Sequence, residues 1–327
     1  MAAGAFMAAV LALTACGGNL DNNSNGNNSA STFPERAVSL LVGQDAGGST
    51  DLIARALAET AGTDLKQPVT VLNKAGANGA LAAKELANAK PDGYTLMVIN
   101  GSLAYITPLA VAPAEAIDIK NYEVITGISQ DDYVLVANPA TGFKTAKDIV
   151  DAKRPIKYAT TGVGTGSQLA SALLFGQAGI TATAVPFNGG APALTAVLGN
   201  QVDVAALQLG EAQAQIKAGK ITPIVTFASK RPTYMPDTPT ATEAGYNIPV
   251  QQSRAIVAPK GTPKEVIDRL RAAFQKAFAA QTYKDFNTQR MLTPHEIDGA
   301  ALLAEWTASL DSYRKLTEQY KINMSGK

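Results

Sequence analysis

Two glycine-rich turns, each between a short apolar run and a helical pattern, constrain this sequence most. The first turn, 47–51 (Gly-Gly-Ser-Thr-Asp), follows the apolar run 37–42, and the second, 160–167 (Thr-Thr-Gly-Val-Gly-Thr-Gly-Ser), follows 156–158. Glycine permits a tight turn and leaves backbone N–H groups uncovered, and a following helix adds partial positive charge at the same place. Such turns bind anions without Arg or Lys. The pair therefore predicts two lobes that close on a small carboxylated molecule.

Composition excludes several classes of function. The 327 residues, 46% of them hydrophobic, suffice for two domains with sizeable cores. The 28 Lys and Arg residues balance 27 Asp and Glu residues, which argues against a nucleic-acid partner. With one His and one Cys in the chain, a zinc site is nearly excluded, and we expect no metal. The single His295 lies in Thr293-Pro294-His295-Glu296, which resembles a capping box, so we expect it on the surface or in a first helical turn.

An enzyme would need a cofactor loop or a nucleophile with its base. The stretch 162–166 lacks the spacing of a dinucleotide fingerprint, and no Gly-Lys-Ser/Thr follows for a P-loop. The chain also offers no plausible nucleophile and base pair. We therefore expect a protein that is not an enzyme and that uses no cofactor.

The N-terminus reads as an export signal. Residues 5–15 are apolar but too short to span a bilayer, as in a signal peptide. The following Leu13-Thr14-Ala15-Cys16-Gly17 resembles a bacterial lipobox, in which Cys16 carries the lipid. The Asn-, Ser- and Gly-rich stretch 19–32 predicts a flexible tether. We thus expect a lipoprotein signal peptide over 1–15, a tether over 16–32, and stable attachment to the membrane through Cys16. Because no Lys or Arg precedes the apolar run, whether the printed N-terminus is complete stays open.

From Phe33 onward, short β-rich runs alternate with helical stretches, which predicts an α/β fold with mixed, mostly parallel sheets flanked by helices. We expect strands at 37–43, 69–73, 94–99, 122–128, 133–137, 156–160, 181–187, 202–208, 221–227 and 255–258. Thr145-Ala-Lys-Asp148 and Thr262-Pro-Lys-Glu265 resemble capping boxes that open helices. The run 133–137 looks like a crossover to a second unit, and 221–236 returns the chain. The prediction is a first domain over 33–132 plus 229–327 and a second over 133–228, joined by a hinge.

The chain resembles the Bug-type extracytoplasmic solute receptors of tripartite tricarboxylate transporters. The resemblance begins at Phe33-Pro-Glu-Arg-Ala-Val38 and Ala46-Gly-Gly-Ser-Thr-Asp51. It continues through motifs at 67–69, 73–79, 91–96, 162–167, 189–194, 201–204, 236–240, 243–245 and 258–263. Each motif alone is weak, but their order over most of the chain is specific. The resemblance implies a two-lobed, periplasmic-binding-protein-like (Venus flytrap) fold that captures small organic anions, such as mono- or dicarboxylates, amides or amino acids.

The resemblance also implies which residues bind the ligand and what the partners are. The first lobe would contribute Gly48, Ser49, Thr50, Asp51, Gly76, Asn78, Asn100 and Ser102. The second would contribute Thr161, Gly162, Thr165, Gly166, Ser167, Asn188 and Gly189. The partner would be the permease subunits of a tripartite transporter, with the receptor a monomer outside the cytoplasmic membrane, in a periplasm or on a cell surface.

The sequence alone leaves several points open. Asp51 either discriminates a ligand amine or braces its loop, and we favour bracing because a carboxylate repels an anionic ligand. Arg254 either reaches the cleft as a ligand clamp or points to solvent, and we expect the solvent-exposed position. The same cleft would also suit an accessory protein of a membrane sensor kinase, and a purely structural lipoprotein is a third reading. The identity of the solute is not readable from these residues.

Overall fold

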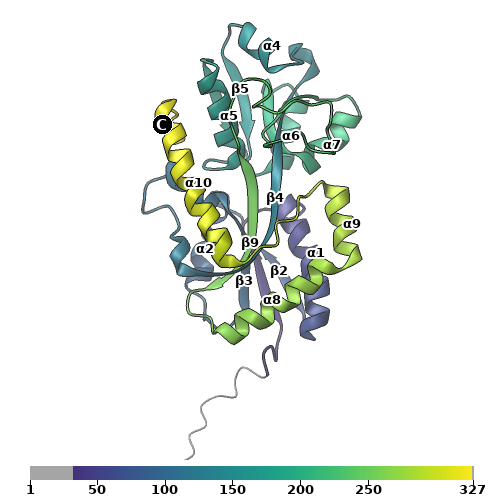
Figure 1. Ribbon diagram of the computed structural model, residues 1–327, viewed down its shortest axis with the longest axis vertical. Helices are drawn as coiled ribbons and strands as arrows, with labels where there is room; N and C mark the ends of the chain where they lie inside the picture. The colour runs from purple at the N-terminus through teal and green to yellow at the C-terminus, as the bar shows by residue number, and fades with distance from the viewer. Residues whose placement is uncertain (1–31, 326–327) are drawn as a thin grey trace, which may run out of the picture.

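The computed structural model describes residues 32–325. The predicted signal peptide, the lipid attachment at Cys16 and all but the end of the predicted tether lie outside these residues. Two lobes stack along the long axis of the molecule, and β4 (Tyr122–Ala137) and β9 (Gln251–Pro259) run between them (Figure 1). None of the helices in the described part of the chain has the length and apolar character to cross a membrane.

The first lobe is built on parallel strands. The strands β1 (Val38–Val42), β2 (Val69–Asn73) and β3 (Thr95–Asn100) lie in the order β2-β1-β3, and β9 joins β3 in the antiparallel sense. Helices α1 (Ser49–Leu65) and α8 (Lys264–Ala279) pack against each other beside this sheet (Figure 1). Their apolar faces, with Leu57 and Phe274 fully buried, form a core with strand residues such as Val38.

The second lobe repeats the pattern. The strands β5 (Ile156–Thr160), β6 (Ala182–Pro186) and β7 (Val204–Gln208) are mutually parallel, in the order β7-β5-β6. Both β7 and β8 (Thr222–Thr226) pair with the second half of β4 in the antiparallel sense. The two-lobed α/β fold with mixed sheets, predicted from the sequence, is confirmed, and in the described chain four of the eight strand pairings are parallel and four antiparallel. The predicted domain boundaries remain a prediction.

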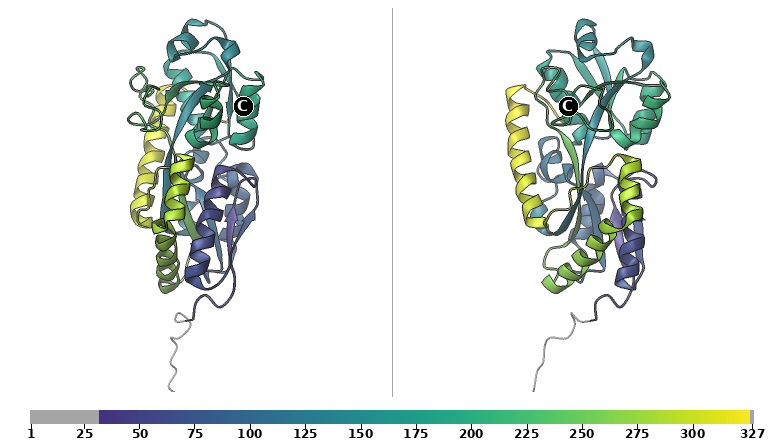
Figure 2. Two further views of the ribbon diagram at one scale, coloured as in Figure 1. Left: turned by 90° about the vertical axis from the view of Figure 1, so that its right-hand side faces the viewer. Right: turned by 45° about the vertical axis from the view of Figure 1, so that its right-hand side comes forward.

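The remaining helices cover these sheets and connect the lobes. They are α2 (Ala80–Ala87), α3 (Ser102–Tyr105), α4 (Ala146–Asp151), α5 (Gly166–Gln177), α6 (Gly190–Leu198), α7 (Leu209–Lys217), α9 (Gln281–Arg290) and α10 (Gly299–Gln319). The last helix, α10, lies along one side of the molecule and ends beside the second lobe (Figure 2). There the Gln168 side-chain amide donates a hydrogen bond of 2.9 Å to the carbonyl of Met324. The C-terminal segment therefore ties the two lobes together.

The strands predicted at 122–128 and 133–137 are one continuous strand, β4. The polar residues 129–132 between them resemble a loop in sequence, but each pairs with a polar residue of 251–254 on β9. For the same reason β9 begins at Gln251, four residues before the predicted start. Across the two strands the Gln251 side-chain amide donates to Asp132, and Arg254 contacts Ser129 and Asp131. A local reading of either segment cannot detect these contacts.

One predicted helix start is wrong, and one predicted cap is absent. The segment 293–296 is not a helical cap: the His295 N–H donates to the carbonyl of Ile128 on β4, and α10 begins only after Asp298 caps it. His295 is partly exposed, and its Nε2 lies 2.7 Å from Glu305. The helix predicted to open at Thr262 is present as α8, but the Thr262 hydroxyl donates to the carbonyl of Pro259 and does not cap it. By contrast, the capping box at Thr145 and Asp148 is present.

Candidate functional site

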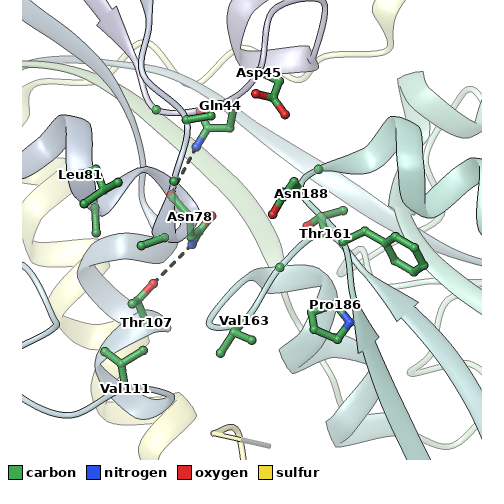
Figure 3. Close-up of a pocket in the computed structure, with 18 of the residues that line it drawn as sticks. Gln44, Asp45, Asn78, Leu81, Thr107, Val111, Thr161, Val163, Pro186 and Asn188 are labelled. Atoms are coloured by element: carbon green, nitrogen blue, oxygen red, sulfur yellow. Dashed lines mark hydrogen bonds between the residues drawn. The ribbon is translucent and has the colours of Figure 1, made fainter.

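A cavity with two connected chambers lies between the lobes. The polar chamber, about 270 Å³, is lined by the loop 44–50 and by residues that include Asn100, Thr165, Gln208, Glu211 and Arg254. The apolar chamber, about 640 Å³, is lined by Leu81 and Val111 on one side and by Val163 and Pro186 on the other (Figure 3), and Phe187 also lines it. Both chambers share Gln44, Asp45, Asn78, Thr161, Asn188 and Gly189. The two chambers therefore form one continuous space.

The first glycine turn brings the start of α1 to the polar chamber. Gly48 is the residue before the helix, in an extended conformation, and no side chain caps the first-turn N–H groups. Because these N–H groups have no partner within the helix, they make this end a site for an anion. Gly48, Ser49 and Thr50 all line the chamber.

Asp51 braces this turn from behind. Its carboxylate accepts hydrogen bonds from the Gly47 N–H at 2.9 Å, the Asn73 side-chain amide at 2.9 Å and the Arg55 guanidinium at 3.0 Å. Burial acts to raise the pKa of Asp51, but these hydrogen bonds outweigh it and hold the pKa below its ordinary value. Asp51 lines neither chamber, so the structure favours the bracing role over contact with a ligand.

The second glycine turn brings α5 to the opposite side of the cavity. Thr165 caps this helix by accepting the Gln168 N–H, and its hydroxyl donates to the carbonyl of Gly162 at 2.8 Å. The loop residues Thr161, Gly162 and Thr165 line the cavity. Ser167 does not, because its buried hydroxyl donates to the carbonyl of Ala206 at 2.7 Å.

The second turn contacts the first lobe across the cavity. The Thr107 hydroxyl, from the first lobe, donates to the carbonyl of Gly164 in the second-lobe turn at 3.0 Å. The Asn78 side-chain amide reaches the same carbonyl at 3.4 Å, and it also contacts Ser102 and Thr107. Gly164 has φ +72°, and a Cβ there would lie 2.9 Å from the Thr107 Cα, so this approach requires glycine. Closure of the cavity thus depends on a contact that a larger residue would prevent.

Arg254, which we expected at the surface, is buried. Its side chain is 1% exposed and forms an ion pair with Asp131 of β4. The guanidinium also donates to Ser49 and Thr50 of the first lobe at 3.1 Å each and to the Gln208 side-chain oxygen of the second at 2.8 Å. The prediction of solvent exposure was wrong because the partners of Arg254 come from distant parts of the sequence. Arg254 lines the polar chamber and joins both lobes beneath it.

Two acidic side chains, Asp131 and Glu211, lie near Arg254. Burial raises the pKa of the Asp131 carboxyl, while Arg254, the Thr293 N–H and the Ser129 hydroxyl act in the opposite direction. Burial likewise raises the pKa of Glu211, which lines the same chamber, against the attraction of Arg254. Among the described residues, the Glu211 Oε2 atom is buried without a hydrogen-bond partner. The cation of the polar chamber is therefore not free to act as a simple carboxylate clamp.

Most of the residues predicted from the sequence reach the cavity. Those that line it are Gly48, Ser49, Thr50, Gly76, Asn78, Asn100, Thr161, Gly162, Thr165, Asn188 and Gly189. Asp51, Ser102, Gly166 and Ser167 lie behind its wall, and a Cβ on Gly166 would meet the Tyr133 ring at 2.7 Å. Whether any of them contacts a ligand remains a prediction.

Sequence reasoning missed several lining residues. These are Gln44, Asp45, Tyr133, Gln252 and Glu211 of the polar chamber and the apolar side chains of the apolar chamber.

The interlobe cavity combines uncovered helix-start N–H groups, hydroxyls and side-chain amides. In the described chain, no group of three or more His, Cys, Asp or Glu is arranged to hold a metal. Such a donor set suits a small anion held mainly by hydrogen bonds.

Comparison with known proteins identifies clear likenesses. The sequence model described as "Tripartite tricarboxylate transporter family receptor" matches residues 53–306, more than half of the chain. A UPF0065 protein of Bordetella pertussis (strain Tohama I) is 32% identical over 266 residues, covering 79% of this chain and 81% of that protein.

Solved structures show the same architecture. The periplasmic binding protein BugD superposes with a TM-score of 0.82 at 28% identity, covering 89% of this chain and 99% of that one. MatC (Rpa3494) from Rhodopseudomonas palustris, solved with bound malate, superposes with a TM-score of 0.81 at 28% identity, covering 87% of this chain and 99% of that one.

Proposed function

This chain belongs to the tripartite tricarboxylate transporter receptor family, and we propose that it captures a small organic carboxylate in the cavity between its lobes. The observation that carries the proposal is the convergence of two helix starts, α1 through Gly48 and α5 through Thr165, on one polar chamber. The first-turn N–H groups of α1 are uncapped and favour negative charge, whereas α5 contributes its capping residue Thr165 and the positive end of its dipole. The malate bound by MatC, a structural neighbour of the same architecture, supports a carboxylate ligand.

The proposed site needs few contacts to bind a carboxylate with micromolar affinity. A hydrogen bond to a charged group contributes roughly 1.5–3 kcal/mol, and micromolar affinity requires about 8 kcal/mol. A few N–H groups together with the hydroxyls of Ser49 and Thr161 reach that range. Because Arg254 is engaged in its ion pair with Asp131, these neutral donors carry the recognition of the carboxylate.

We propose that the loaded receptor delivers its solute to the membrane permease of a tripartite transporter. The family description names the transporter, and the two lobes joined by β4 and β9 provide a surface that changes when the cavity closes. We further propose that the protein acts outside the cytoplasmic membrane, as a monomer attached through a lipid on Cys16. Radiolabelled palmitate should be incorporated into the parent protein in bacteria and lost in Cys16→Ala.

Calorimetric titration with mono- and dicarboxylates tests the binding proposal. We expect at least one carboxylate to bind with an affinity in the micromolar range or tighter. Ser49→Ala should weaken it about tenfold or more, because one hydrogen bond to the anion is lost. Ser312→Ala, on the exposed surface of α10, is the control and should bind like the parent. Absence of binding by any carboxylate would refute the proposal.

A further inference from the structure

The larger chamber of the cavity presents apolar side chains to its interior from both lobes. Leu81 on α2 is 59% exposed and Val163 in the second-lobe turn is 38% exposed, and Figure 3 shows them on opposite sides of the cavity. Within the described chain, the large exposed hydrophobic residues are these two, Leu72 and Tyr234. Half of them therefore line one chamber. Clustered exposed hydrophobic residues of this kind mark a binding groove.

The charges of this chamber disfavour a second anionic group. Its charged lining residues are Asp45, Glu115 and Lys84, two negative and one positive. Every other side chain of the lining is neutral, and Val111, Pro186 and Phe187 add to the apolar surface. The polar chamber has the same count, with Asp45 and Glu211 against Arg254, but it adds the uncapped N–H groups at the start of α1, which attract an anion. An uncharged body would gain from burial against Leu81 and Val163.

The two chambers also differ in size. The polar chamber of about 270 Å³ has room for a carboxylate and its neighbouring atoms, whereas the apolar chamber measures about 640 Å³. Cavities of roughly 300–1,000 Å³ hold molecules larger than a four-carbon diacid. The shared residues Asn78 and Asn188 lie where the chambers join, so one elongated molecule can extend through both.

We propose that the solute is an amphipathic monocarboxylate, with its carboxylate in the polar chamber and an aryl or alkyl body between Leu81 and Val163. This inference rests on the proposed function, because it assumes that the polar chamber holds the carboxylate. Each methylene group buried in the apolar chamber raises affinity about fourfold. Selectivity then comes from the apolar chamber and affinity from both.

A matched pair of ligands tests the preference. Adipate and hexanoate share a six-carbon chain and one carboxylate, and they differ only in whether the far end is charged. We expect calorimetry to show hexanoate and 3-phenylpropanoate binding at least about tenfold more tightly than adipate. Tighter binding of adipate would overturn the inference while leaving carboxylate capture intact. Failure of all three ligands to bind, together with shorter mono- and dicarboxylates, would overturn both.

Serine variants with a matched control test whether the apolar body of the ligand lies in this chamber. Leu81→Ser and Val163→Ser should each weaken 3-phenylpropanoate by about fivefold or more and leave propanoate unchanged. Leu72→Ser removes an equivalent side chain, 39% exposed on β2, that lines neither chamber, and it should bind both ligands like the parent. If Leu81→Ser and Val163→Ser behave like Leu72→Ser, the apolar body does not lie in this chamber.

Discussion

Arg254 of β9 and Asp131 of β4 form an ion pair at the junction of the two lobes, with side chains 1% and 3% exposed. Beyond the pair, the guanidinium contacts Ser49 of the first lobe and Gln208 of the second. The pair therefore lies under the polar chamber and holds both of its sides. Its position connects the stability of the fold to the shape of the site.

Removing one partner of this pair should destabilise the protein strongly. Asp131→Asn or Arg254→Met leaves a buried charge without its counter-ion, which costs about 3–5 kcal/mol of unfolding free energy. The double variant Asp131→Leu with Arg254→Met should cost less than either single change, because no unpaired charge remains. Urea denaturation measures all three. Lys264→Ala, which removes an exposed ion pair with Asp268, should cost under about 1 kcal/mol and serves as the control.

Stability should depend on the ionisation of Asp51. Its folded-state pKa lies below its ordinary value of 3.8 because Arg55, the Gly47 N–H and Asn73 bind the carboxylate. The stabilisation is therefore complete above the unfolded pKa and is lost as the pH falls through the folded pKa. Asp51→Asn should lower the unfolding free energy near neutral pH and reduce its decline in acid. A variant with the acid decline of the parent would show that Asp51 does not brace the turn.

The contribution of Glu211 to stability should depend on pH in the opposite sense to that of Asp51. Burial raises its folded-state pKa, so ionisation costs the folded protein free energy as the pH rises above the ordinary value of 4.5. Stability attributable to this residue is highest below that pH and falls through the raised pKa. Glu211→Gln should lessen the loss of unfolding free energy between about pH 4 and neutral pH. An unchanged pH profile would mean that the Glu211 carboxyl is solvated.

The contact at Gly164 should control closure of the cavity. A Cβ at Gly164 would press on the Thr107 backbone, whereas a Cβ at Gly142, with nearly the same φ of +76°, would meet nothing within 4 Å. Both Gly→Ala changes carry similar backbone strain of about 1–2 kcal/mol. Only Gly164→Ala should also weaken carboxylate binding, and small-angle scattering should show a more open protein. Equal affinities for the two variants would exclude Gly164 as a closure contact.

The sequence predicted the elements that depend on neighbours along the chain. Both glycine turns precede helices, and Thr145 and Asp148 form their capping box, because the required residues lie within a few positions of each other. The polar segment 129–132 was misread because its partners lie at 251–254, more than a hundred residues away.

The same distinction between nearby and distant partners in the sequence applies to the residues of the site. Loop residues such as Ser49 and Thr161 were predicted from the turn motifs and line the cavity. Arg254 was misplaced because its burial depends on Asp131 and Gln208, which only the folded sheet brings together. The apolar chamber was not predicted, since Leu81 and Val163 come from different lobes and no local pattern relates them.

A crystal structure with the carboxylate that gives the largest thermal shift would show directly which groups of the polar chamber hold the ligand. We expect its carboxylate oxygens within hydrogen-bond distance of backbone N–H groups at the start of α1 and of second-lobe donors such as Thr161 or Thr165, in the chamber lined by Ser49 and Thr165. A carboxylate bound outside this chamber, or held by one lobe alone, would contradict this expectation.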